Sequence, residues 1–344
     1  MSASLPDNLF THHRLVEDGE FIFRLSDQYR ATLLAGNDAP LPAALPDEKL
    51  PPLQATLSLA HHLMGVFGHF VRLDDSDALL KTLIMRIAKL VKRSPDGCIA
   101  SILLSPYEFY APHHAINCAM LAALTANNLQ LSADEHNILI GAALTMNLGS
   151  ADIQNQMAHQ DSPPSTLQRQ ILDIHPLLSS AMLREISIED QEWHSAIMMH
   201  HERRDGKGYT FGVKGDEIPP FAQLLHLLDV VTAKLMPRSY RSRVPPKQAL
   251  ASLYSGENEE FNPDFVAQLV KILGIYPPGS CVALQNGERA LVIKNGKTAA
   301  TPLAVLIKNP DRSIDTSEAG YHIDHSVNLH VEARHLHLFH QYWS

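Results

Sequence analysis

A run of polar residues in the second half of the chain has the residue types of a metal or phosphate site. It reads HHERRDGKGYT, residues 200–210. The adjacent His200 and His201 can reach two metal ions, or a metal and a phosphate, because consecutive helical side chains diverge by about 100°. The glycines that follow allow a tight loop whose backbone amides can approach an anion. The segment therefore predicts a site for a metal ion, an anion or both.

A carboxylate follows in an otherwise apolar helical stretch. Asp229 lies within LLHLLDVV, residues 224–231. Burying a carboxylate costs free energy unless it is paired, and a cation is a natural partner. We therefore expect Asp229 to belong to the same site.

The elements that must position this site are helical. Apolar periodicity predicts helices over 113–130, 133–147, 165–185, 189–201, 218–236, 246–254 and 262–273. Turn clusters such as HQDSPPS separate them. Residues 98–275 are therefore predicted to form an all-α domain.

The region before this domain is also predicted to be helical, and it is a candidate regulatory part covering residues 1–97. One or two helices are expected over 8–34, followed by a Pro-rich loop over 39–52, because successive prolines deny helical hydrogen bonds. The SPDG turn at 94–97 marks the boundary.

Residues 276–344 have a different sequence pattern, with short alternating apolar segments and Asn-Gly pairs at 286–287 and 295–296. Such pairs are typical of β-hairpin turns. The predicted fold class is therefore mainly α, with a small β-rich appendage at the C-terminal end.

Composition narrows the classes of function. The formal net charge of −9 disfavours a nucleic-acid surface, which needs a positive footprint. The start of the chain has no export signal, and the most apolar long segment, 53–71, is interrupted by histidines. We expect a cytoplasmic protein without a membrane segment. Cys98, Cys118 and Cys281 are expected to be reduced thiols, because they form no disulfide or zinc pattern.

Three motifs resemble the HD-GYP family, bacterial cyclic di-GMP phosphodiesterases within the wider HD phosphohydrolases. They are HHERRDGKGYT, EIPPFAQLLHLLDVVTAKLMPRSYR and HHAINCAMLAAL, and the likeness runs over residues 110–285. The resemblance implies a helical HD-domain bundle. It also implies one set of metal ligands: His114, His175, His200, His201 and Asp229.

The chain departs from this family where the His-Asp pair should stand. Met146 takes the place of the ligand histidine, Asn147 that of the metal-bridging aspartate, and Ser150 that of the lysine. Tyr110 stands where one branch of the family has a glutamate ligand. A neutral amide is a much weaker ligand than a bridging carboxylate, so two-metal hydrolysis should suffer most.

Two interpretations of the five remaining ligands stay open at this point. They hold one divalent ion (Fe, Mn or Zn), since three or four ligands suffice for one site, or they hold none and are retained for packing. Met146 is most simply a core residue. His113, outside the family pattern, is expected at the surface or behind the ligands.

The loop and a later RSYR motif supply candidate ligand- or partner-binding residues. These are Arg203, Arg204, Asp205, Gly206, Lys207, Gly208, Tyr209, Thr210, Arg238 and Arg241. They contact phosphate or a partner, or they are a solvated charged face.

Three functions remain as hypotheses. The first is a degenerate HD-GYP signalling protein that binds cyclic di-GMP or a GGDEF-domain protein. The second is an active metal-dependent phosphodiesterase, and the third is a scaffold similar to HDOD domains.

Overall fold

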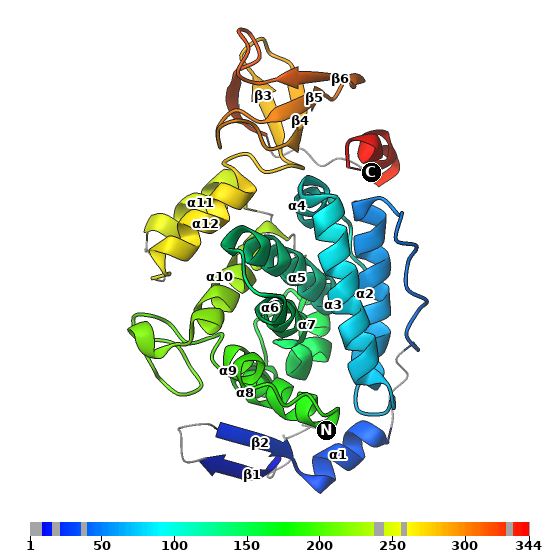
Figure 1. The fold of residues 1–344 in the computed structure, drawn as a ribbon, viewed down its shortest axis with the longest axis vertical. Helices are drawn as coiled ribbons and strands as arrows, with labels where there is room; N and C mark the ends of the chain where they lie inside the picture. Colours follow the sequence, from blue (N-terminus) through cyan, green and yellow to red (C-terminus); the bar gives the residue numbers. More distant parts are fainter. Residues whose placement is uncertain are drawn as a thin grey trace.

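The computed structural model describes residues 9–15, 21–35, 40–236, 244–255, 260–327 and 333–343. Its body is a bundle of helices, with a two-stranded hairpin at one end and a five-stranded sheet at the other (Figure 1). The predicted fold class, mainly α with a β-rich appendage, is confirmed. No helix in the described part of the chain has the length and hydropathy needed to cross a bilayer.

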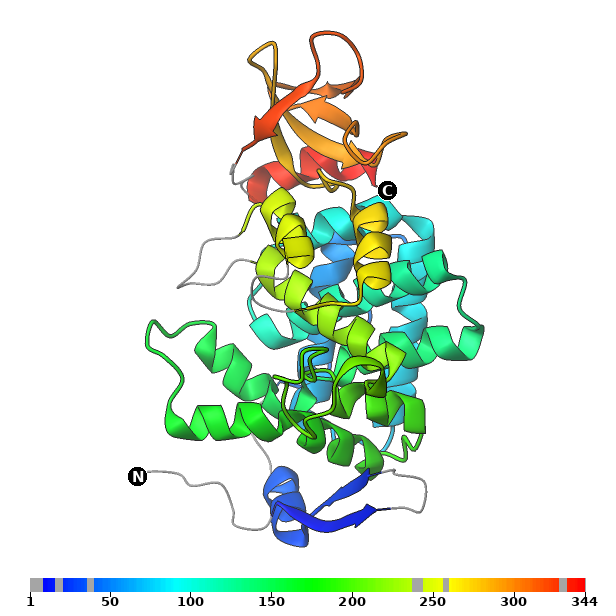
Figure 2. The ribbon, with the colours of Figure 1, turned by 90° about the vertical axis from the view of Figure 1, so that its left-hand side faces the viewer.

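The N-terminal part begins with a hairpin, so the helices expected over 8–34 are wrong for its first half. β1 (Phe10–Leu15) pairs antiparallel with β2 (Phe21–Leu25), and only then does α1 (Asp27–Leu34) follow. The reason lies in FIFRL, whose aromatic and β-branched residues favour a strand over a helix. Strand β2 of this hairpin packs against α8 (Thr166–Glu185) of the body (Figure 2).

The Pro-rich stretch is the predicted loop. Residues 40–51 contain no helix or strand, and they run across α2 (Pro52–His69). A Cβ added at Gly65 of this helix would lie 2.4 Å from Pro42 Cα. The close approach of the loop therefore requires glycine at this position.

The SPDG turn at 94–97 ends one helix and begins another. α3 (Ser76–Arg93) precedes it, and α4 (Pro95–Leu104), which the sequence analysis missed, starts with a proline that suits a first helical turn. Together with α2, these helices pack against α5 (Tyr110–Leu129) in one shared apolar core. The division into three domains stays a prediction.

α5 is the central helix of the body. Every residue from 110 to 126 is buried, and a helix that is apolar on most sides must be enclosed by others. The enclosing helices are α2, α3, α6 (Ala133–Thr145), α10 (Pro220–Leu235) and α12 (Pro263–Leu273) (Figures 1 and 2). The other body helices are α7 (Ala151–Met157), α8 (Thr166–Glu185), α9 (Gln191–Met198) and α11 (Pro246–Ser255).

The C-terminal sheet is antiparallel throughout, with strand order β6-β5-β4-β3-β7. Its strands are β3 (Cys281–Leu284), β4 (Arg289–Lys294), β5 (Leu303–Leu306), β6 (Asn309–Asp315) and β7 (Ile323–Ser326). The Asn-Gly pair at 286–287 forms the predicted turn between β3 and β4. The pair at 295–296 opens a longer link to β5 instead.

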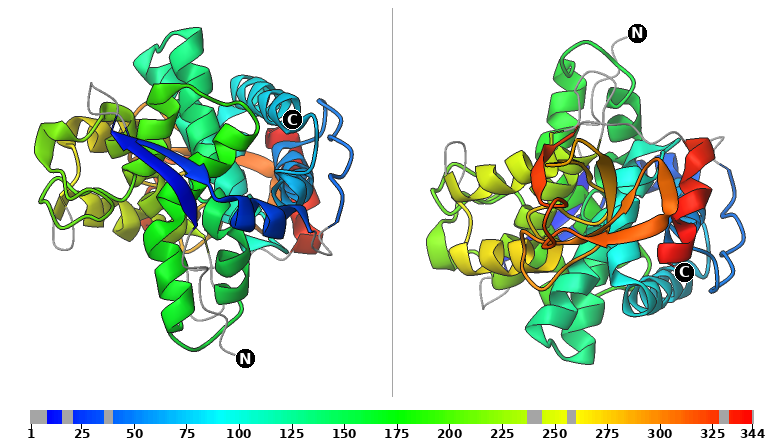
Figure 3. Two further views of the ribbon diagram at one scale, coloured as in Figure 1. Left: turned by 90° about the horizontal axis from the view of Figure 1, so that it is seen from below. Right: turned by 90° about the horizontal axis from the view of Figure 1, so that it is seen from above.

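A 3₁₀ helix, η3 (Ala333–Tyr342), fastens this appendage to the body (Figure 3). After it, Trp343 Nε1 donates to the Ile293 carbonyl at 2.8 Å, and the Trp343 carbonyl accepts from Ser94 Oγ at 2.7 Å. One residue therefore joins the sheet to the start of α4.

Candidate metal and ligand-binding pocket

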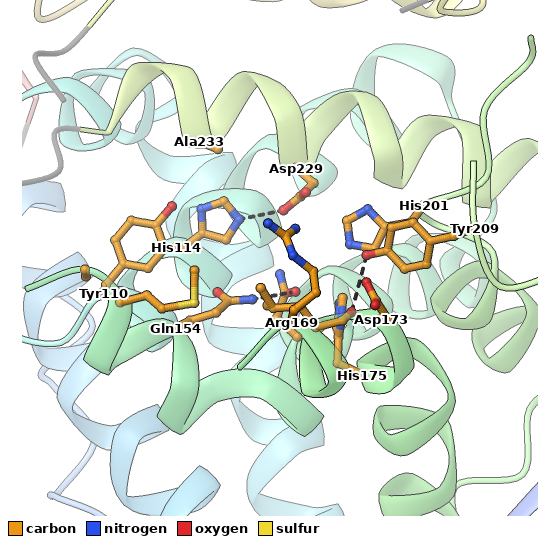
Figure 4. A pocket seen from close by; sticks show the side chains of 14 residues that line it. Tyr110, His114, Gln154, Arg169, Asp173, His175, His201, Tyr209, Asp229 and Ala233 are labelled. Atoms are coloured by element: carbon orange, nitrogen blue, oxygen red, sulfur yellow. Dashed lines mark hydrogen bonds and ion pairs between the residues drawn. The ribbon is translucent and has the colours of Figure 1, made fainter. Parts of the chain in front are cut away.

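A pocket of about 260 Å³ opens between α5, α7, α8, α10 and the loop after α9 (Figure 4). His114, His175, His201 and Asp229 line it, and His200 is fully buried beside His175. The structure thus brings the five sequence-predicted ligands together, but in two separate groups.

The first group contains His175, His200 and His201, and local backbone features orient it. Pro176 has no amide hydrogen, so α8 leaves the Leu172 carbonyl without its usual donor, and His175 Nδ1 bonds to it at 2.6 Å. His200 follows the end of α9, where carbonyls lack helical partners, and its Nδ1 bonds to the Ile197 carbonyl at 2.6 Å. Because a carbonyl only accepts, both imidazoles carry their proton on Nδ1.

The Nε2 atoms of these two histidines therefore present lone pairs. They face each other 3.4 Å apart, and a cation between them would relieve the repulsion. Two nitrogens on one tetrahedral ion, each at about 2.0–2.1 Å, lie about 3.3–3.4 Å apart, so this distance fits a shared metal. His201 adds a third nitrogen, and the three ligand atoms lie within 4.8 Å of one another.

All three histidines are uncharged near neutral pH. Burial lowers the pKa of His175 to about 3 and that of His200 to about 4. Burial, followed by the neighbouring imidazoles, holds the pKa of His201 well below its usual value. Neutral imidazole is the form that binds metal, and a ligating histidine usually donates its other nitrogen to a carbonyl or carboxylate. His175 and His200 meet both requirements, and His201 meets the first.

The second group contains His114, Cys118 and Asp229. His114 Nε2 lies 2.7 Å from Asp229 Oδ1 and 3.4 Å from Cys118 Sγ, which is one helical turn away on α5. Tyr110 stacks on His114, with ring centroids 5.5 Å apart and planes at 18°. An aromatic ring therefore occupies the place where one branch of the family has a glutamate.

The charges of the second group differ from those of the first. Burial alone would lower the pKa of His114, but Cys118, Tyr110 and the hydrogen bond to Asp229 outweigh it and raise that pKa well above the usual value. Burial would raise the pKa of Asp229, but the hydrogen bond and charge of His114 lower it. His114 Nε2, the nitrogen that faces Asp229, is therefore not available to a metal while this hydrogen bond is kept.

Met146, Asn147 and Ser150, the residues expected in place of the family's His-Asp pair and lysine, are packed or hydrogen-bonded within the chain. Met146 is fully buried in the apolar core, as expected for a core residue. Asn147 lines the pocket, and its Oδ1 accepts from Gln154 Nε2 at 2.9 Å. The same Gln154 nitrogen lies 3.0 Å from Ser150 Oγ. A hydrogen-bonded amide pair thus lies where the resemblance led us to expect the bridging carboxylate.

The glycine-rich loop folds back over the three-histidine group. A Cβ on Gly208 would lie 2.4 Å from the Arg203 nitrogen, so the loop can close only with glycine there. Closure places Tyr209 over His201, with centroids 4.7 Å apart and planes at 21°. The Tyr209 hydroxyl also lies 3.5 Å from the Leu172 carbonyl (Figure 4). Tyr209 therefore covers one side of the candidate metal site.

Glu202, the third residue of the HHE motif, holds this loop in shape. It is 1% exposed, and its Oε1 accepts from the amides of Phe211 and Gly212 at 2.6 and 3.1 Å. Its role is thus to position the loop, which the sequence analysis did not recognise.

The arginines predicted to bind a ligand are paired within the loop. Arg203 forms an ion pair with Asp205 at 2.7 Å, and Arg204 bonds to Asp216 at 3.1 Å and to Gln223 at 2.9 Å. Of the candidate ligand-binding residues in the loop, only Tyr209 lines the pocket. Gly206, Lys207, Gly208 and Thr210 do not. Arg238 and Arg241 lie outside the described residues.

The sequence analysis also missed four residues that line the pocket or belong to the ligand groups. Cys118 follows His114 by one turn, and Arg169, Asp173 and Gln154 line the pocket. The four-residue spacings 114–118 and 169–173 are the signal that could have found three of them, since such residues share a helix face.

His113 is 2% exposed and therefore does not lie at the surface. The three cysteines are free and buried, as expected.

Comparison with known proteins identifies the fold of this site. The family model described as HD domain matches residues 97–265, which contain both groups of candidate ligands. Residues 97–265 therefore form an HD domain. A solved HDG"Y"P protein from Bdellovibrio bacteriovorus shares the fold of this HD-domain protein, with a TM-score of 0.53 and 16% identity, over 77% of this chain and 94% of that one.

Curated relatives also match this HD-domain protein. It is 25% identical over 247 residues to the cyclic di-GMP phosphodiesterase PA4108 of Pseudomonas aeruginosa, covering 69% of this chain and 59% of that protein. It is 30% identical over 172 residues to the cyclic di-GMP phosphodiesterase response regulator RpfG of Xanthomonas campestris, covering 46% and 44%. The chain spans about half the length of these relatives. The resemblance to the HD-GYP family is confirmed.

Proposed function

We propose that this protein is a signalling HD-GYP protein that holds one divalent metal ion, binds a cyclic dinucleotide and hydrolyses it slowly or not at all. The observation that carries the proposal is the contrast between the two groups of ligands. Three neutral histidines present lone pairs to a common point, whereas His114 and Asp229 are already paired with each other.

The three-histidine group would hold an iron, manganese or zinc ion. His175, His200 and His201 supply nitrogen ligands that suit all three metals, and three ligands leave a position open for a phosphate oxygen or water. When bound, such an ion polarises a phosphoryl oxygen.

Hydrolysis is expected to be impaired because the bridging position holds Asn147. A bridging carboxylate supplies the negative charge that keeps two cations close and orients the attacking water. The neutral amide cannot supply this charge, and Gln154 already occupies its oxygen. Recovery of a second ion would also require His114 and Asp229 to give up their ion pair.

A cyclic dinucleotide is the ligand class that the relatives support. Among them are the cyclic di-GMP phosphodiesterase of Pseudomonas aeruginosa and a 3'3'-cGAMP-specific phosphodiesterase of Vibrio cholerae. The pocket volume of about 260 Å³ lies just below the about 300–1,000 Å³ of most ligand pockets. We therefore expect one phosphodiester and its sugar to enter, with a base stacked on the exposed part of Tyr209 at the rim.

The loop of residues 203–217 is the proposed contact for a protein partner such as a GGDEF-domain protein. Its arginines hold the loop in one shape through Asp205 and Asp216, while the Lys207 side chain is 77% exposed. A rigid loop with an exposed cation and a partly exposed aromatic ring suits protein recognition, because little entropy is lost on binding.

Three assays on one preparation test the proposed function. The protein is purified without a histidine tag or chelator, and cyclic di-GMP and 3'3'-cGAMP are titrated by calorimetry. Turnover is then followed by chromatography with added manganese or iron. We expect saturable binding, and turnover slower than that of an intact HD-GYP enzyme by on the order of 100-fold or more. Comparable turnover would establish an active phosphodiesterase, and absence of binding would favour a scaffold.

A further inference from the structure

The Arg169 side chain reaches into the pocket. Arg169 lies near the start of α8, and its side chain extends into the pocket lined by Asp229 and His201 (Figure 4). Asp173 and Asp229 line the same pocket, yet the Arg169 side chain makes no ion pair or hydrogen bond with any residue that the structure describes. This guanidinium is therefore available to an anion.

The contrast with the loop arginines indicates a functional position. Arg203 and Arg204 each have a carboxylate partner, which fixes them within the loop. Arg169 is exposed and holds no element in place. Packing does not account for its position, so its removal should leave the fold intact.

The chemistry of the guanidinium suits a phosphate group. Arginine is always charged, and its planar N–H donors match two oxygens of one phosphate. The carboxylates of Asp173 and Asp229 also line the pocket, and Arg169 is the side chain there that can offer several charged donors to an incoming anion. His175 and His201 line the same pocket, so an ion held by the three-histidine group could share that phosphate.

We propose that Arg169 binds the phosphate group of the ligand and supplies positive charge that a second metal ion would otherwise provide. This inference rests on the proposed function to the extent that the ligand is a phosphodiester held beside the three-histidine group. One metal ion and one guanidinium then recognise the phosphate together. Such a pair binds a phosphodiester without the bridge needed to activate water.

The test compares Arg169→Ala, Arg169→Lys and the matched control Gln170→Ala, an exposed neighbour outside the pocket. Metal content and melting temperature are measured for each variant. Dissociation constants for inorganic phosphate and for cyclic di-GMP are then determined by calorimetry on the metal-loaded protein.

We expect Arg169→Ala to bind both probes about 10- to 100-fold more weakly, the loss typical of a hydrogen-bonded charge. Arg169→Lys should fall between it and the wild type, because charge is kept and the forked geometry is lost. Metal content and melting temperature should stay unchanged in both, and Gln170→Ala should match the wild type.

The outcomes separate this inference from the proposed function. Equal binding by Arg169→Ala and wild type overturns the inference alone, and so does a loss of metal content in Arg169→Ala. Wild-type protein that binds phosphate through Arg169 but no cyclic dinucleotide overturns the proposed function and keeps Arg169 as the phosphate residue for another ligand. Failure of the wild type to bind either probe overturns both.

Discussion

The Nε2 atoms of His175 and His200 lie 3.4 Å apart, and both rings use Nδ1 on a backbone carbonyl. Pro176 makes one of these carbonyls available, and the end of α9 provides the other. These two backbone carbonyls therefore orient both Nε2 atoms towards one ion position. His114 and Asp229, by contrast, are hydrogen-bonded to each other.

This difference predicts opposite effects of removing a histidine from each group. His200→Ala should lose metal affinity by more than the about 10- to 100-fold that follows loss of a ligand's hydrogen-bond partner. His114→Ala should keep the full metal content, because His114 Nε2 is bonded to Asp229 and not directed at the three-histidine group. Elemental analysis after dialysis measures both, with the exposed His159→Ala as control. Loss of metal from His114→Ala would show that the two groups act as one site.

Restoring the family's residues should add a second ion. Asn147→Asp supplies the missing negative charge at the pocket wall, and Met146→His adds a ligand beside it. We expect higher metal occupancy in the double variant than in the wild type. Because Met146 is fully buried, Asn147→Asp alone is the second variant if the double variant unfolds. A folded double variant with unchanged metal content would mean that the site has diverged beyond these two positions.

Tyr209 should stabilise the bound state through its ring. Tyr209→Ala removes the stack on His201 and should weaken cyclic di-GMP binding by about 1 kcal/mol, or about fivefold. Tyr209→Phe keeps the ring and loses only a 3.5 Å hydroxyl contact, so it should bind nearly as the wild type does. Calorimetry distinguishes the two. Equal losses in both variants would assign the effect to the hydroxyl.

His194 should make the protein less stable in acid. Burial, followed by the charge of Arg184, lowers its pKa to about 4, and its two nitrogens bond to Ser180 Oγ and the Ile188 carbonyl, each at 2.9 Å. The unfolded chain takes up the proton near pH 6.5. The stabilisation is therefore complete above this pH and is lost as the pH falls towards 4, by about 3 kcal/mol.

Denaturant titrations between about pH 7.5 and about pH 4.5 measure this loss. His194→Gln should be less stable at neutral pH but should show a flatter dependence on pH, while the exposed His159→Gln should keep the wild-type slope. An unchanged slope in His194→Gln would assign the acid sensitivity to other groups.

Much of the fold could be predicted from the sequence because the body helices carry strong apolar periodicity. The hairpin over residues 10–25 was missed because FIFRL is short, and period-two and helical patterns are hard to separate over five residues. α4 was missed because an apolar run after SPDG was interpreted as the far side of a boundary, although proline commonly begins a helix.

His200, His201 and Asp229 could be found because a histidine pair and an aspartate in an apolar helix stand out by residue type, whereas His114 and His175 came from the family resemblance. Their division into two groups depends on distances between helices far apart in the chain, which no local pattern contains. Likewise, the sequence cannot indicate that Arg203 has an acidic partner while Arg169 has none among the described residues, because both are simply charged residues near the site. Side-chain pairing is a tertiary property.

Native mass spectrometry of the metal-free wild-type protein, titrated with manganese, iron or zinc, tests the central claim most directly. It counts the ions held by each folded chain. The three-histidine group and the ion pair of His114 with Asp229 lead us to expect one tightly bound ion and no second. Two or three tightly bound ions in the wild type would contradict the account, and so would a chain that binds none.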